Sequence, residues 1–551
     1  MRPITMKMAS FLLGWCLVAG AAEQPAPPAY DLVIRGGRVL DGAGNPWIAA
    51  DVAISSGRVA RIGTIRERGR REIDARGLYV SPGWIDMMDQ STIALTKNGL
   101  AENKILMGVT TVIAGEGGTP VPAAQIPAYF RSLEEQGISV NFGVYYNATQ
   151  ARIEVYGEGA GTPTAEQMQQ MKARVEEAMQ AGVLGVSSAL IYPPGSFQSS
   201  AELTELVKAA AACGGIYASH IRDESEKLLD AVREAIAIGE ASGVPVEIFH
   251  LKAAYAPTWG KVMPEVGTLI EQARARGVDV AADMYPYTAG GTGLSITIPN
   301  WVFEDGFEKG LERVKDPEVR ERLKREVAAG SQPGWSNLVE ASGGWDRIVL
   351  ANAFNPRYDE FRYQSIAAIA KRLGRDPADV AWDIVVEAYP NRAMALFFMM
   401  DENDLKTALR YPWVSIGSDA AAAEKLGEMD ALGLPHPRAY GTFPRIIAEY
   451  VRKQNVLTLE DAIRKMTSWP ATRMRLSDRG VIREGAYADI TIFDYEKIED
   501  RATWERPTAL PEGIEYVIVN GEVVLEHGRH TGAKPGKVLR NRTCSAEPTA
   551  G

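Results

Sequence analysis

The stretches GGIYASHIRDE, residues 214–224, and PVEIFHLKAA, residues 245–254, decide how the rest of this chain is interpreted. Each contains a short apolar run that ends on a histidine, His220 in the first and His250 in the second, and a helical segment, Ser225–Ile238, lies between them. In a parallel barrel the carboxyl ends of neighbouring strands open on one mouth, where the chemistry takes place. Two imidazoles at such a mouth predict a metal site.

A single histidine at the end of a strand more often makes a structural hydrogen bond than it binds a metal. This chain has only five histidines in 551 residues, and two of them close successive strand-like runs. The pair therefore favours a metal site over two unrelated structural histidines.

The middle of the chain, about residues 81–470, alternates apolar strand-like runs with segments of helical periodicity. Eight runs are expected to be strands: Trp84–Asp89, Val109–Glu116, Val140–Tyr146, Leu184–Ile191, Ile216–His220, Val246–His250, Val278–Tyr285 and Val414–Asp419. Eight strands separated by helices predict a (β/α)8 TIM barrel. The segment at about 290–348, which includes a charged helix expected over Leu311–Ala328, predicts an inserted lid subdomain over the mouth.

Both ends of the chain are rich in β-strand patterns. Short runs of alternating apolar and polar residues are separated by tight-turn pairs such as Asn520-Gly521. Residues 23–80 and 471–540 are therefore expected to form one small β-sandwich domain, with 541–551 as a tail.

The first 22 residues have the pattern of a secretory signal peptide. Arg2 and Lys7 precede the apolar run Met8–Val18, and small residues at 19–22 offer a cleavage site. The apolar run is short for a membrane span. We therefore expect a secreted or periplasmic protein whose mature form has no membrane contact.

The net charge disfavours one class of partner, and the cysteines allow one disulfide. The formal net charge is −10, which disfavours a nucleic acid as partner because phosphate binding needs a basic face. Of the three cysteines, Cys16 would leave with the signal peptide, and the sequence leaves open whether Cys213 and Cys544 form a disulfide.

Longer stretches across residues 30–540 resemble the D-aminoacylase, or N-acyl-D-amino-acid deacylase, family of the amidohydrolase superfamily. They include YDLVIRGGRVLDGAG, SPGWID, GVTTVIAGEGG, GGIYASHIRDE, DMYPYTAGGTG, HPRAYGTFPR and MTSWPATRMRLSDRGVIREGAYADITIFD. The resemblance implies a metal-dependent barrel with a β-sandwich, and hydrolysis of the N-acyl amide of a D-amino acid. A ring-opening cyclic amidase shares this fold, but the lysine that such enzymes use in strand four is absent from GVLGVSSALIY.

The expected metal site departs from the family pattern. Met88 and Gln90 stand where the family usually carries His-x-His, and Gly117 stands where it carries a cysteine. Methionine and a neutral amide are poor zinc ligands, and glycine has no side chain. Glu116 is a candidate replacement, which would give one zinc ion the ligands His220, His250 and Glu116. Neighbouring strand residues face opposite sides, so this requires the glycine-rich segment to bend.

The resemblance implies that Asp419, at the end of the eighth strand, is the acid/base residue. A carboxylate there can accept a proton from water and pass it to the leaving amine. The alternative is that Asp419 caps a following helix. Asp223, close after His220, is a candidate to orient that imidazole.

The carboxylate of an N-acyl amino acid needs cationic or hydroxyl donors. Lys252, two residues beyond His250, is expected to face the same side as that histidine. The resemblance adds Arg438 and Tyr285 to this carboxylate site. Each of the three residues could instead be structural.

We therefore expect a metal-dependent amide hydrolase that uses one zinc ion and acts on an N-acyl-D-amino acid or a short peptide. Two alternatives stay open from the sequence. The first is a D-residue-specific dipeptidase or peptidase of the same fold. The second is a catalytically inactive binding protein, which the loss of the family residues at Met88, Gln90 and Gly117 would explain. The sequence does not determine the oligomeric state.

Overall fold

Eight strand positions form a closed parallel barrel in the computed structural model, which describes residues 28–430 and 432–544. The predicted signal peptide lies outside the described residues. The barrel strands are β6 (Trp84–Asp89), β7 (Val109–Ala114), β8 (Asn141–Val144) with β9 (Tyr146–Asn147), β10 (Gly185–Ala189), β11 (Ile216–His220), β12 (Val246–Ile248), β13 (Val280–Met284) and β17 (Val414–Ile416). Each position coincides with one of the eight predicted runs, so the predicted barrel is present.

The barrel closes because its first and last strands meet. Strands pair in parallel in the orders β6-β7-β8 and β9-β10-β11-β12-β13-β17, and β8 and β9 are interrupted only at Tyr145. The backbone N–H of Asp419 donates to the carbonyl of Met88 at 2.8 Å, and that of Gln90 donates to the carbonyl of Ala420 at 3.2 Å. These bonds join the end of β17 to the end of β6.

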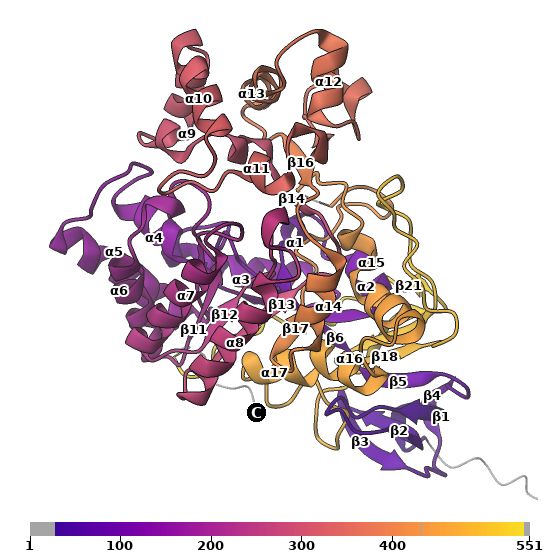
Figure 1. Ribbon diagram of the computed structural model, residues 1–551. Helices are drawn as coiled ribbons and strands as arrows, with labels where there is room; N and C mark the ends of the chain where they lie inside the picture. The colour runs from indigo at the N-terminus through magenta and orange to yellow at the C-terminus, as the bar shows by residue number, and fades with distance from the viewer. Residues whose placement is uncertain (1–27, 431, 545–551) are drawn as a thin grey trace, which may run out of the picture.

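Helices cover the outside of the barrel (Figure 1). They are α1 (Ala94–Lys97), α2 (Glu102–Leu106), α3 (Ile126–Gln136), α4 (Ala148–Val155), α5 (Ala165–Ala181), α6 (Ser200–Ala211), α7 (Leu228–Ser242), α8 (Val262–Ala275), α14 (Glu402–Arg410), α15 (Arg438–Arg445), the π-helical η8 (Ile446–Lys453), α16 (Leu459–Met466) and α17 (Ser468–Arg473). Helix α7, for example, buries Leu228, Ala231, Val232 and Ala235 on one face, as the spacing of an amphipathic helix requires. No helix in the described ranges is long and apolar enough to cross a membrane.

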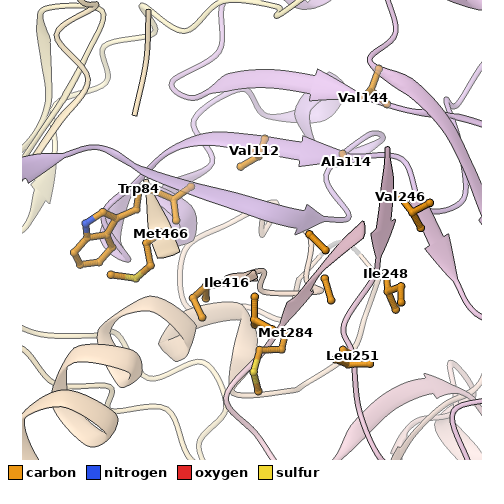
Figure 2. Packing of buried hydrophobic residues seen from close by; sticks show 14 of the residues in the cluster. Trp84, Val112, Ala114, Val144, Val246, Ile248, Leu251, Met284, Ile416 and Met466 are labelled. Atoms are coloured by element: carbon orange, nitrogen blue, oxygen red, sulfur yellow. The ribbon is translucent and has the colours of Figure 1, made fainter. Parts of the chain in front are cut away.

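The apolar core lies between the strands and these helices. Figure 2 shows Val112 and Ala114 of β7, Val246 and Ile248 of β12, and Ile416 of β17 packed together, all at 1% exposure or less. Fully burying such a side chain contributes about 1.5–3 kcal/mol. This core fixes the strand ends that carry the functional side chains.

A nine-stranded sheet is built from both ends of the chain. Its strands are β1 (Tyr30–Val39), β2 (Ile48–Ser55), β3 (Arg58–Gly63), β4 (Gly69–Asp74), β5 (Tyr79–Pro82), β18 (Ile490–Phe493), β19 (Ile514–Val519), β20 (Glu522–Glu526) and β21 (Arg529–His530). The antiparallel pair β5–β18, with Val80 opposite Ile492, joins the N-terminal strands to the C-terminal ones. The expected β-structure from both termini is present.

The elements between β13 and α14 form an inserted unit with its own apolar core. It contains the antiparallel strands β14 (Gly290–Gly293), β15 (Ile348–Asn352) and β16 (Met394–Phe397), the short 3-10 helices η4 (Leu294–Thr297) and η5 (Asn300–Phe303), and α9 (Phe307–Val314), α10 (Pro317–Ala328), α11 (Leu338–Ser342), α12 (Ile366–Leu373) and α13 (Pro377–Ala388). Its helices stand together at the top of Figure 1.

The inserted unit differs from the expectation in two respects. It continues to Phe397, well beyond the expected range 290–348. The single helix expected over Leu311–Ala328 is two helices, because Asp316 caps the N-terminus of a new helix in which Pro317 takes the first position. A disulfide joins Cys213, after α6, to Cys544, which answers the question that the sequence left open.

Candidate functional site

A cavity of about 510 Å³ opens at the carboxyl ends of the barrel strands. Its wall contains all the residues expected to bind the metal, move the proton or hold the substrate carboxylate: Glu116, His220, His250, Lys252, Tyr285, Asp419 and Arg438. The inserted unit contributes the opposite wall through residues such as Thr292 and Arg392. A concave site with convergent polar groups at this end of a barrel is where an active site is expected.

Glu116, His220 and His250 meet at one point of this cavity. The Nδ1 atom of His220 lies 2.7 Å from Oε1 of Glu116, and Nε2 of His250 lies 3.3 Å from the same oxygen. One ligand atom from each of the three residues lies within 4.8 Å of the others. We refer to these three residues as the His₂Glu group.

The glycines around Glu116 explain how it reaches the histidines. Gly115, directly after β7, has φ 102°, a conformation that side chains disfavour. A Cβ atom there would lie 2.6 Å from the carbonyl oxygen of Tyr145. The chain therefore turns out of the strand at Gly115, and the alternation of side chains along β7 no longer applies to Glu116. Gly117, at the family's cysteine position, lines the cavity without offering a ligand.

Glu224 lines the cavity and contacts both histidines, through the ring nitrogens that do not face Glu116. No motif in the sequence had indicated this role. The Oε1 atom of Glu224 is 3.1 Å from Nδ1 of His250, and its Oε2 is 3.4 Å from Nε2 of His220. Each histidine thus presents one ring nitrogen to Glu116 and turns the other toward Glu224. A carboxylate behind a histidine is the usual way to fix the ring and tautomer of a metal ligand.

Asp223, which was expected to orient His220, has a different role. Its Oδ1 accepts hydrogen bonds from the backbone N–H and the hydroxyl of Ser225, and its Oδ2 accepts one from the hydroxyl of Ser336. Asp223 therefore holds the turn after β11 to the inserted unit. The expectation was wrong by one position, because the carboxylate that contacts His220 is that of the next residue, Glu224.

The carboxylates control the protonation of the site. Burial alone would lower the pKa of His220, but the neighbouring Glu224 and Glu116 outweigh it and raise this pKa to about 9. Burial alone would raise the pKa of Glu116, but hydrogen bonds from His220 and His250 hold it well below its ordinary value. The cavity floor is therefore strongly charged.

Gln90 connects the His₂Glu group to Asp419. Its Nε2 atom donates to Oε2 of Glu116 at 2.6 Å and to Oδ1 of Asp419 at 3.2 Å. Met88 lies buried beside it, with its sulfur 3.8 Å from the same nitrogen. An amide and a thioether thus occupy the part of the site where the family pattern has two histidines.

Asp419 points into the cavity and does not cap a helix. The next described helix, α15, begins only at Arg438, so the capping alternative fails. Its Oδ2 lies 2.7 Å from Nη1 of Arg438. The backbone of Asp419 has φ 49°, and that of His250 has φ 35°, conformations that cost of order 1–3 kcal/mol each and cluster at functional sites.

One wall of the cavity contains Arg438, Tyr285 and Lys252. Its two cations are paired with different carboxylates. The guanidinium of Arg438 lies 4.8 Å from the centre of the Tyr285 ring. Its Nη1 atom is paired with Asp419, and its buried Nε atom has no hydrogen-bond partner. The ammonium of Lys252 donates to Glu224 at 2.5 Å and lies 2.7 Å from Nδ1 of His250. Lys252 faces the same side as His250, as expected, but its charge is already paired with Glu224.

The remaining histidines lie outside the His₂Glu group. His436 is buried, with Nε2 3.0 Å from the carbonyl of Ala289 and Nδ1 accepting from the N–H of Arg438. His530 ends β21 of the nine-stranded sheet, and His527 lies in the turn between β20 and β21.

The donor set of the His₂Glu group fits a divalent metal such as zinc. Two imidazoles and one carboxylate are the ligands of many catalytic zinc sites, and they leave a coordination position for water or substrate. A metal that binds here displaces the ring proton of His220 from the nitrogen that it takes. His220 and His250 are 5% and 2% exposed, and the carboxylate behind them is the support that such ligands require.

Comparisons with known proteins match this chain to amidohydrolases, including deacylases. The sequence model of the amidohydrolase family matches residues 144–525. An N-acyl-D-glutamate deacylase and a D-aminoacylase from Alcaligenes xylosoxydans xylosoxydans are 32% and 31% identical to 93% of this chain, over 96% and 97% of their own lengths. A crystal structure of N-acyl-D-glutamate deacylase from Bordetella bronchiseptica, complexed with zinc and a phosphonate mimic of the tetrahedral intermediate, superposes with a TM-score of 0.77 at 30% identity, covering 93% of this chain and 99% of that one. A crystal structure of D-aminoacylase also reaches 0.77.

Proposed function

This chain belongs to the amidohydrolase family and is a metal-dependent hydrolase of amide bonds, and from that premise we propose that it releases a D-amino acid from an N-acyl-D-amino acid, using one zinc ion held by Glu116, His220 and His250. The observation that carries the proposal is the convergence of the His₂Glu group, Asp419 and Arg438 in one cavity. An inactive binding protein would have no chemical need for all of these groups.

In this proposal the chain's own residues bind, orient and move one proton. When bound, the zinc ion supplies a Lewis acid for the amide carbonyl and lowers the pKa of a water. Asp419 accepts the proton of the attacking water and returns it to the leaving nitrogen. Arg438 and Tyr285 bind the substrate carboxylate, because the guanidinium of Arg438 lines the cavity beside the Tyr285 ring and its buried Nε atom has no hydrogen-bond partner.

Glu224 and Lys252 support the metal ligands. Glu224 fixes the rings of His220 and His250, and Lys252 holds Glu224 in place through its 2.5 Å contact. Lys252 also lines the cavity, but its ammonium is already paired with Glu224, so Arg438 and Tyr285 carry the binding of the substrate carboxylate.

Gln90 supports a count of one zinc ion. Its amide nitrogen lies between Glu116 and Asp419, and an N–H donor there repels a cation. A D-aminoacylase of known structure has a binuclear metal centre, with one-metal activation and second-metal attenuation. In this chain the poor zinc ligands at Met88 and Gln90 support a single metal ion.

An exported, secreted or periplasmic location is part of the proposal. It rests on the signal-like sequence of residues 1–22 and on the Cys213–Cys544 disulfide, since disulfides persist in oxidising compartments.

The test is hydrolysis of paired enantiomers. The zinc-loaded protein is incubated with the N-acetyl-D and N-acetyl-L forms of a set of amino acids, and the free amine is quantified. We expect release from the D forms alone, loss of release after chelation, and recovery with zinc. Release from the L forms only, or release that chelation leaves unchanged, would overturn the proposal.

A further inference from the structure

A second cavity, of about 310 Å³, borders the active-site cavity. Tyr192, Asn391 and Arg392 line both spaces and form their shared boundary. The hydroxyl of Tyr192 lies 2.9 Å from Oγ1 of Thr292, and the guanidinium of Arg392 lies over the Tyr192 ring at 5.1 Å. None of the residues that the sequence singled out lines this second space.

The wall of the second cavity is mostly apolar and partly open to solvent. It is lined by Pro193 and Pro194 after β10, by Ile296 and Phe303 of η4 and η5, and by Phe307, Tyr389 and Pro390. The rings of Phe303 and Phe307 stack at 5.0 Å, and Phe307 and Tyr389 remain 36% and 46% exposed. Large apolar side chains exposed beside a reaction site favour an apolar ligand.

Four rings lie at or just after the carboxyl ends of four neighbouring strands, β10, β11, β12 and β13, which pair in that order around the barrel. The ring centres of Tyr192 and His220 are 5.1 Å apart, those of His220 and His250 4.4 Å, and those of His250 and Tyr285 6.5 Å. The carboxylate-binding side, Tyr285 with Arg438, is therefore at one end of this series. The two histidines that face the reacting carbonyl are in the middle, and Tyr192, at the border of the second cavity, is at the other end.

We propose that the second cavity binds the acyl chain of the substrate and that this enzyme acts on N-acyl-D-amino acids with a long or aromatic apolar acyl group. A substrate with its carboxylate at Arg438 and its carbonyl at the His₂Glu group directs its acyl chain past Tyr192. The inference rests on the proposed function and names the substrate class of the same site.

The test measures binding rather than turnover, so it does not depend on hydrolysis. The probes are N-methanesulfonyl-D-leucine and N-octanesulfonyl-D-leucine, in which a sulfonamide replaces the amide and is not hydrolysed by this route. Calorimetry with the zinc-loaded protein gives the ratio of the two dissociation constants. Each methylene that becomes buried strengthens binding about fourfold, so we expect the octyl probe to bind at least about tenfold more tightly.

Variants locate the effect. Ser295 lines only the second cavity, and Ser295→Phe fills it, so the ratio should fall to within about twofold of one. Phe307→Ala removes one apolar wall and should lower the ratio about threefold or more. Tyr363→Ala is the matched control: Tyr363 is an aromatic residue of the same inserted unit, 44% exposed, and lines neither cavity, so its ratio should equal that of the wild type.

Four results overturn the inference. Equal affinity for both probes contradicts this inference alone, and so does a tight octyl probe whose ratio neither Ser295→Phe nor Phe307→Ala changes. A third series of probes keeps the methanesulfonyl group and lengthens the amino-acid side chain. If Ser295→Phe removes the gain from that lengthening, the cavity binds the side chain, and the acyl assignment is wrong. Binding of no probe contradicts the proposed function as well.

Discussion

Glu116 and Glu224 together set the chemistry of the cavity at the level of single residues. Glu116 contacts one ring nitrogen of each histidine, at 2.7 and 3.3 Å, and Glu224 contacts the other ring nitrogen of each, at 3.4 and 3.1 Å. This arrangement fixes both rings before any ligand arrives. A preorganised site loses little free energy when it orders around a metal or substrate.

Asp419 is expected to affect turnover and to leave the metal in place. We expect Asp419→Asn to lower kcat about 10²- to 10⁴-fold, because general acid–base catalysis contributes a factor of that size. Zinc content should stay at the wild-type value, since Asp419 is outside the His₂Glu group. The measurements are steady-state kinetics and elemental analysis of the same preparations.

The matched control for that variant is Asp376→Asn. Asp376 caps the N-terminus of α13 in the inserted unit, and asparagine caps equally well, so kcat should not change. A kcat for Asp419→Asn within a factor of ten of the wild type, or loss of zinc from that variant, would exclude the assigned role.

For single residues, the sequence predicted which side chains belong to the site better than it predicted which atoms they contact. His220 ends β11 and His250 lies two residues after β12, and these two strands pair side by side, so the convergence of the histidines followed from the motif spacing. The meeting of Glu116 with them depended on the backbone turn at Gly115, which a pattern of alternation cannot predict. The pairing of Lys252 with Glu224 instead of a free ammonium depended on a loop conformation after β11.

Helix α16 illustrates how an element is fixed to the barrel. Its Lys465 side chain is fully buried, and the Nζ atom donates to the carbonyl of Val414, the first residue of β17, at 3.2 Å. Burial lowers the pKa of Lys465 to about 8, from an ordinary value of 10.5. The Lys465 ammonium thus holds α16 against the start of β17, the strand that leads to Asp419.

The depressed pKa of Lys465 predicts a pH dependence of stability. Between pH 8 and 10.5 the unfolded chain binds a proton at this position that the folded chain does not, so the free energy of unfolding rises with pH over that interval. The rise amounts to about 3 kcal/mol at most. In Lys465→Met this contribution disappears, and the difference in unfolding free energy between the wild type and the variant changes by that amount across the interval.

Denaturant unfolding at several pH values measures this difference. Lys425→Met, at a side chain that is 77% exposed, is the control and should follow the wild-type profile. Parallel profiles for the wild type and Lys465→Met would contradict the account of this helix.

Element by element, the strands were easier to predict than the inserted helices. The barrel strands are short and buried on both faces, so they can be recognised in the sequence as short, mostly apolar runs. The inserted unit follows local capping signals instead: Asp316 and Pro317 start a new helix inside a run that helical periodicity alone treats as continuous.

At the scale of the whole molecule, the two ends of the chain close on the barrel. The β5–β18 pair joins the N-terminal and C-terminal strands, and the Cys213–Cys544 disulfide fixes the C-terminal segment to the end of α6 across 331 residues of sequence. The nine-stranded sheet was predictable from its turn pairs, whereas the disulfide was not, because two cysteines with no neighbouring motif give no geometric signal.

Loss of this disulfide should destabilise the folded chain. We expect Cys213→Ser to lower the free energy of unfolding by about 2–4 kcal/mol, since closing a long loop restricts the unfolded chain. The denaturation midpoint in urea measures the effect, and reductant should lower the midpoint of the wild type but not that of the variant. Equal midpoints for the wild type with and without reductant would contradict the prediction.

The measurement that tests the central claim most directly is the zinc content of the mature protein, determined by elemental analysis for the wild type, His220→Ala and Glu116→Ala. The account predicts about one zinc ion per wild-type chain and loss of that ion in both variants, because each removes one of three ligands. Retention of zinc in Glu116→Ala would remove Glu116 from the ligand set. A wild type that binds no zinc even when zinc is supplied would contradict the His₂Glu site and the mechanism built on it.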